Sequence, residues 1–119
     1  MSKLSEIDPA LELMEKFAKV TGKAVSHIDS LRKEAIFTTG DVPAKYKVLA
    51  ACLWAIAGRC ESCIKFYIMQ ATKLGATEKE VGEFLAIAST MGGCVGEMWA
   101  LKAFKAYHDK QGTDSCCQA

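Results

Sequence analysis

The chain has 119 residues, 50% of them hydrophobic, and a formal net charge of +1. This length predicts one domain with enough apolar side chains for a core, and the small net charge argues against a nucleic-acid-binding protein. No apolar run reaches the ~18–20 residues of a membrane span, and no apolar signal segment follows Met1, so we expect a cytoplasmic protein with no membrane or nucleic-acid partner.

Two amphipathic helices are predicted in the first third of the chain. Asp8 is a candidate N-cap before Pro9, and the apolar stripe that follows ends near Gly22. A second stripe runs from Val25 to Ile36. Both patterns are typical of helices that bury a single face.

A third helix is predicted over residues 43–57, with Asp41 as its N-cap. It has little polar face after Lys47, so we expect it to be buried. Gly58 and Arg59 then interrupt the pattern.

Glycines and a capping box divide the second half of the chain. A fourth helix ends at Gly75, a typical C′ residue, and Thr77 with Glu80 forms a capping box for a fifth. Gly92-Gly93 separates the fifth helix from a sixth. The sequence shows no strand alternation and predicts a single all-α domain over residues 1–119. We expect about six helices in a core over 9–110, with antiparallel neighbours, and a flexible tail over 111–119.

Cys60 and Cys63 form a C-x-x-C pair at the start of the predicted fourth helix. Residues three apart share one helix face, so the two thiols can close a disulfide. The free amides of a helix start favour a thiolate, and we expect Arg59 and Lys65 to add to this effect and Glu61 to oppose it. A thiolate beside a second thiol can reduce a peroxide or a disulfide.

Two other interpretations of this pair remain open. Cytosolic thiols are kept reduced, so six cysteines favour catalysis or metal binding over a static disulfide scaffold. Cys60 and Cys63 could hold a metal together with Cys116 and Cys117, although adjacent cysteines share one tetrahedral ion poorly. Alternatively, the thiols are inert hydrophobic side chains, as we expect for Cys52 on the apolar third helix.

Several short motifs follow one another within residues 43–107. An apolar helix leads to the C-x-x-C pair, the next helix ends in Leu74-Gly75-Ala76-Thr77, and Glu83-Phe84-Leu85-Ala86-Ile87-Ala88 precedes the Met91-Gly92-Gly93 break. In this order the motifs resemble the carboxymuconolactone decarboxylase and alkylhydroperoxidase D family. The resemblance implies an all-helical domain that assembles into trimers or hexamers, and thiol-dependent peroxidase or disulfide-reductase chemistry.

The proton relay of that family is replaced in this sequence. The family pattern has Glu twelve residues before the C-x-x-C and His four residues after it; these positions hold Val48 and Tyr67 here. The resemblance implies that Cys63 attacks and Cys60 is its partner. Tyr67, with an ordinary pKa of ~10, is a poor base at pH 7 but can donate a hydrogen bond to a thiolate or a substrate oxygen.

Glu97, Cys94 and Lys65 are the auxiliary candidates. Glu97 and Cys94 follow the Gly92-Gly93 break. They can lie near the cysteine pair only if this break faces the one at Gly58-Arg59. His27 and His108 have no position that fixes them beside Cys63, and a solvated or capping role is the simpler interpretation for both.

The sequence therefore predicts a homo-oligomeric thiol oxidoreductase of peroxidase or disulfide-reductase type, with Cys60, Cys63 and Tyr67 as its site. An external thiol or dithiol would reduce the pair, and no organic cofactor is implied, because no phosphate-binding or dinucleotide motif is present. The alternatives are a non-enzymatic protein that senses redox state or binds a soft metal, and a lactone decarboxylase-like lyase, which would need acid and base residues instead.

Overall fold

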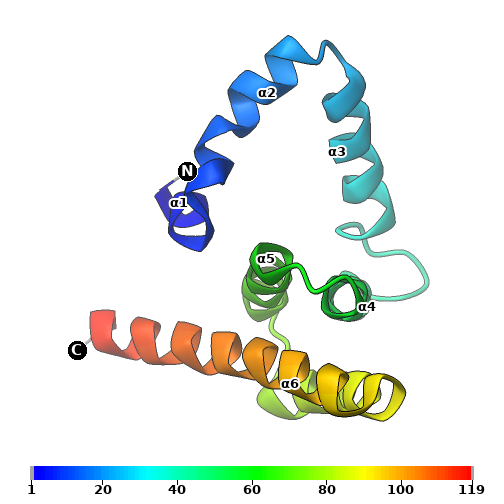
Figure 1. Ribbon diagram of the computed structural model, residues 1–119, viewed down its shortest axis with the longest axis vertical. Helices are drawn as coiled ribbons and strands as arrows, with labels where there is room; N and C mark the ends of the chain where they lie inside the picture. The colour runs from blue at the N-terminus through cyan, green and yellow to red at the C-terminus, as the bar shows by residue number, and fades with distance from the viewer. Residues whose placement is uncertain (1, 119) are drawn as a thin grey trace.

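The computed structural model describes the backbone of residues 2–118 and the side chains of residues 4–109. Every element of regular secondary structure in the described backbone is a helix, with turns and loops between them, which confirms the predicted all-α class. Figure 1 shows its elements, which are α1 (Ser2–Ile7), η1 (Pro9–Leu13), α2 (Met14–Val20), α3 (Ala24–Ala35), α4 (Ala44–Ala57), α5 (Glu61–Lys73) and α6 (Glu78–Gln118). The expected flexible tail over 111–119 lies outside the residues whose side chains are described.

The core is formed by α4, α5 and α6, which pack against one another. Helix α4 is buried as expected: Val48, Leu49 and Cys52 are each at most 1% exposed. Ile64 and Ile68 of α5 and Val81 of α6 complete the best-buried part of this core. On α4 and α5 the buried positions recur after three to four residues, so one face of each of these helices is removed from water.

Local capping follows the sequence at two helix starts, those of η1 and α6. The Asp8 carboxylate accepts the Ala10 N–H at 2.9 Å, and the Thr77 and Glu80 side chains exchange hydrogen bonds with each other's backbone N–H groups, as predicted. The prediction for Asp41 is wrong. The first amide of α4, that of Ala44, donates to Thr39 Oγ1 at 2.9 Å, because the 39–43 loop folds back over the helix start.

The N-terminal elements form an arm rather than a layer of the core. In Figure 1, α1, η1, α2 and α3 arch over one side of α4–α6, and η1, α2 and α3 contain no buried residue. The arm contacts the core through α1, which packs on α5. Phe17, Val20 and Leu31 are more than half exposed on it, so the arm carries an apolar face that the single chain does not cover.

Helix α6 changes direction at Gly93, at the predicted break. Gly93 has φ 63° and ψ −148°, a backbone conformation almost restricted to glycine. Three residues later, Gly96 is buried, and a Cβ there would collide with the carbonyl oxygen of Ala88. The two glycines therefore allow the segments on either side of the kink to pack closely.

Among the described residues, Glu78–Asp109 of α6 has the length and hydropathy of a membrane span. Length and composition do not establish one, since core helices of water-soluble proteins pass the same test and Gly93 interrupts this helix. Met91, Met98 and Leu101 expose more than half of their surface along it.

Candidate active site

A tight turn places Cys60 at the start of α5. Helix α4 ends at Gly58, and Arg59 takes a positive φ of 54°, which reverses the chain. The Cys60 N–H then donates to the Ala55 carbonyl at 3.0 Å, and Cys60 itself has the extended backbone of an N-cap residue. The Cys60 side chain therefore points at the free amides of the next helix.

The Cys60 sulfur receives hydrogen bonds from the first turn of α5. The Cys63 backbone N–H donates to Cys60 Sγ at 3.4 Å, and Ser62 Oγ lies 3.6 Å from the same sulfur. A side-chain hydrogen bond from Cys63, with further help from Ser62, lowers the pKa of Cys60. Donors aimed at a sulfur favour its ionised form, so Cys60 is the thiol of the pair that ionises first.

Cys63 has the opposite environment. Burial, followed by the hydrogen bond to Cys60, raises the pKa of Cys63 to about 11. Cys60 is thus the thiol of the pair that more readily gives a thiolate, and Cys63 stays protonated beside it near neutral pH. A Cys60 thiolate can attack a substrate, and the Cys63 thiol can then close a disulfide as its proton passes to the departing group.

We expect Cys60 to be alkylated before Cys63 at pH 7. Iodoacetamide reacts with thiolates, so the alkylation rate increases as a thiol ionises. The midpoint of this increase should lie at a lower pH for Cys60 than for a free thiol such as N-acetylcysteine. Cys63 should reach half of its maximal rate only near pH 11, following its pKa of about 11. Peptide mass after short labelling pulses measures both; faster labelling of Cys63 at pH 7 would contradict the assignment.

Two cavities meet at the pair. The first, which we call the arm cavity, has a volume of about 280 Å³ and lies between the arm and α5, with Cys63 and Tyr67 in its wall. The second, the α4 cavity, has about 500 Å³ and is lined by Cys60, Cys63 and Tyr67 together with exposed Trp54. Both thiols can therefore be approached from outside, and Cys63 can be approached from two sides.

Tyr67 stands beside the pair as the sequence predicts, in an aromatic cluster. Its ring stacks on Phe37 with 6.2 Å between centroids and meets the edge of Phe66 at 5.4 Å. Burial raises the pKa of Tyr67, so it remains a protonated hydrogen-bond donor at neutral pH. Val48, at the other relay position, is fully buried and has no titratable group.

Arg32 is a site residue that the sequence analysis missed. It extends from α3 into the wall of the arm cavity, and its charge opposes the upward shift in the pKa of both Cys63 and Tyr67. It is also bonded to Asp29 at 3.0 Å, one turn earlier on α3. No local motif marks Arg32, because it reaches Cys63 only through the fold of the arm.

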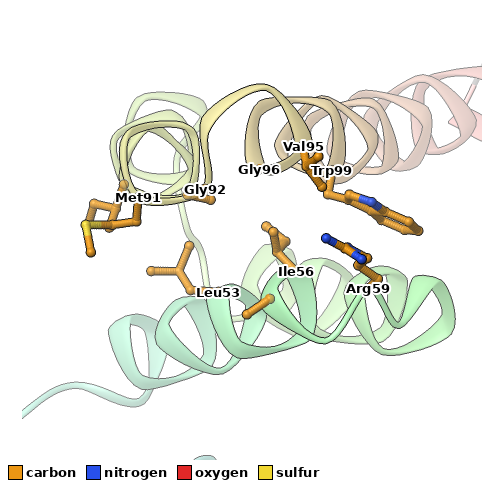
Figure 2. A pocket seen from close by; sticks show the side chains of 11 residues that line it. Leu53, Ile56, Arg59, Met91, Gly92, Val95, Gly96 and Trp99 are labelled. Atoms are coloured by element: carbon orange, nitrogen blue, oxygen red, sulfur yellow. The ribbon is translucent and has the colours of Figure 1, made fainter.

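The other candidates lie away from the two thiols. Lys65 is ion-paired with Glu61 at 3.3 Å on the outer face of α5. Arg59 extends into a third cavity, of about 380 Å³, between α4 and α6, which it lines together with Trp99 and Met91 (Figure 2). Arg59 of the first break and Gly92 of the second line this same cavity, whereas Gly58 and Cys60 line the α4 cavity.

Four further candidate residues line neither cavity at the cysteine pair. Cys94, Glu97 and His27 are exposed, and His108 is 2.8 Å from Glu78.

Cys52 is buried, and burial raises its pKa to about 12, so it is the inert thiol that its position on the apolar helix predicts. Within the described residues no three Cys, His, Asp or Glu side chains are grouped to hold a metal. Cys116 and Cys117, the remaining ligands of the metal alternative, lie outside the described side chains.

A family profile and a solved structure indicate the same family for this chain. The Carboxymuconolactone decarboxylase family profile matches residues 23–106. A crystal structure of an apo carboxymuconolactone decarboxylase family protein from Legionella pneumophila superimposes with a TM-score of 0.82 and 32% identity, over 92% of this chain and 97% of that one. An uncharacterised protein of Cupriavidus necator is 41% identical over 70 residues, which span 59% of this chain and 61% of the relative's length.

Proposed function

Because the chain belongs to the carboxymuconolactone decarboxylase family, we propose that it is a thiol-dependent oxidoreductase that reduces a peroxide or a disulfide with Cys60 and Cys63. One observation supports this most directly: Cys60 Sγ accepts the Cys63 N–H at 3.4 Å at the start of α5. The same contact stabilises a Cys60 thiolate and holds Cys63 beside it. An inert buried thiol such as Cys52 has neither feature.

With a peroxide, the cycle has two steps inside the protein. The Cys60 thiolate attacks the terminal oxygen, the O–O bond breaks, and the leaving oxygen takes a proton, which gives an alcohol or water and a sulfenic acid on Cys60. The Cys63 thiol then attacks the Cys60 sulfur, an S–S bond forms, and water leaves. Neutral Tyr67 lines the cavity of both thiols and can donate a hydrogen bond to the departing oxygen.

This order of attack is the reverse of the one that the family resemblance implies. In the family pattern, a Glu and a His serve the second cysteine; Val48 and Tyr67 supply no base here. The hydrogen bonds to Cys60 remain and need no relay, because they stabilise the thiolate directly. We therefore assign the attack to Cys60 and the closing of the disulfide to Cys63.

The pair should be measured first in defined dithiol buffers. After equilibration, alkylation and peptide mass would count the reduced thiols, and a second series would add hydrogen peroxide. The proposal expects a reversible loss of two thiols at Cys60 and Cys63, driven by peroxide. If both thiols stay open to alkylation under oxidant, the proposal is wrong, and metal binding at the cysteines becomes the function to test.

We also propose that the protein acts in the cytoplasm as a trimer or hexamer. The exposed apolar side chains of the arm and of α6, such as Phe17, Val20 and Met91, are suited to contacts between copies of this chain. Light scattering after size-exclusion chromatography measures the mass; a monomer at micromolar concentration would contradict this assembly.

A further inference from the structure

We propose that the cysteine pair has separate entrances for its two reactants: the substrate reaches Cys60 through the α4 cavity, and a carboxylate-bearing thiol binds in the arm cavity and reduces the disulfide at Cys63. The inference rests on the proposed function and adds to it the class of the reductant and its place of entry. It starts from the position of the sulfurs, since Cys60 lines the α4 cavity, whereas Cys63 lines both.

The arm cavity has the lining expected of a site for a small amphipathic anion. Its walls are apolar and come from both sides, with Leu11 and Met14 from the arm and Phe66 from α5. Its charged groups are Arg32, Lys33 and Asp29, all on α3.

The two cations and one carboxylate of the arm cavity sum to one positive charge. The Asp29 carboxylate is bonded to Arg32 at 3.0 Å and balances one of the two cations. The pair is half exposed, so the remaining positive charge can meet a carboxylate at the mouth while an alkyl chain extends along the aromatic wall toward Cys63.

The chemistry of disulfide exchange selects the same sulfur. A reductant thiolate that attacks Cys63 forms a mixed disulfide there, breaks the Cys60–Cys63 bond and releases Cys60 as a thiolate. A second reductant thiolate then attacks the reductant sulfur of the mixed disulfide, releases Cys63 and leaves with the first as an oxidised disulfide. Exchange is faster when the leaving thiol is the more acidic one, and Cys60 has the lower pKa of the two.

The α4 cavity has a different lining. Its wall is mostly apolar, with Ala51, Ala55 and the exposed indole of Trp54, and its cation, Lys47, donates a hydrogen bond to the Thr38 carbonyl at 2.7 Å. An uncharged peroxide can approach Cys60 there without meeting the charges of α3. The charged side chains of α3 therefore line only the cavity of the reductant, whereas Cys63 and Tyr67 line both cavities.

The test compares two reductants that differ only in their head group, mercaptohexanoate and mercaptohexanol. The oxidised full-length protein is mixed with each, and the rate of disulfide opening is measured per thiolate. We expect the carboxylate to react about threefold faster, the size of an exposed charge interaction, and Arg32→Gln with Lys33→Gln to remove this preference. Arg32 also acts on the pKa of Cys63, so the ratio of the two rates within each variant is compared, and not either rate alone.

Lys19→Gln provides the matched control. Lys19 lies on α2 of the same arm, is well exposed, and pairs with Glu15 outside the cavity, so its loss should leave the preference intact. Acid quenching and fragmentation of the 60–65 peptide should find the mixed disulfide on Cys63.

Equal rates for the two thiols, a preference that survives in the double variant, or an adduct on Cys60 would each overturn the inference. Those results would leave the proposed function standing, because mercaptohexanoate and mercaptohexanol would both still reduce the disulfide that peroxide forms. A pair that peroxide never oxidises would instead defeat the proposed function itself.

Discussion

Cys60→Ser is expected to lower peroxide consumption by at least about a hundredfold, because it removes the thiolate and leaves a thiol that is largely protonated. The pKa of Cys63 is about 11, so only about one molecule in 10,000 carries a Cys63 thiolate at pH 7. Burial, the main cause of that shift, persists in the variant. Peroxide loss under a dithiol donor measures the effect.

Cys63→Ser should behave differently although it also stops turnover. Cys60 should still react once with peroxide and stay as a sulfenic acid, which a dimedone adduct on the 60–65 peptide would reveal. Its rate of first attack should stay close to that of the parent protein, because the serine hydroxyl can donate to Cys60 Sγ in place of the Cys63 thiol and the backbone N–H still does. Adducts on Cys63 in Cys60→Ser, with none on Cys60 in Cys63→Ser, would instead support the order that the family resemblance implies.

Gly93→Ala is expected to destabilise the fold by about 1–3 kcal/mol. Gly93 has φ 63° and ψ −148°, and an alanine can adopt that backbone only with strain. Relief of the strain would straighten α6 and pull its second half away from α4 and α5. Urea unfolding followed by helical circular dichroism gives the free energy of unfolding.

Gly82→Ala is the control for this variant. Gly82 lies within the first part of α6, and a Cβ there meets no atom within 4 Å. Alanine has the higher helix propensity, so this change should stabilise the fold by about 0.5–1 kcal/mol. If the two variants have the same free energy of unfolding, glycine is not needed at Gly93 for stability, and the prediction is wrong.

The local features of this protein are determined by its sequence. The helices after residue 23, the Thr77–Glu80 capping box, the break at Gly92-Gly93 and the position of Cys60 at a helix start depend on neighbours within four residues, and the structure confirms each of them. The first predicted helix instead divides into η1 and α2, and α1 precedes them. Asp41 shows the limit of this reasoning. The loop that folds back over α4 offers Thr39 Oγ1 instead, and loop geometry is not encoded by residue type alone.

The tertiary structure decided the surroundings of the two thiols. Arg59 and Lys65 are next to them in sequence, yet the first extends into the cavity between α4 and α6 and the second pairs with Glu61. Arg32, about thirty residues away, is the cation whose charge acts on Cys63. A helix or turn sends successive side chains in different directions, so nearness in sequence does not set which charge meets a sulfur. The fold of the arm does, because it places α3 across the arm cavity from α5.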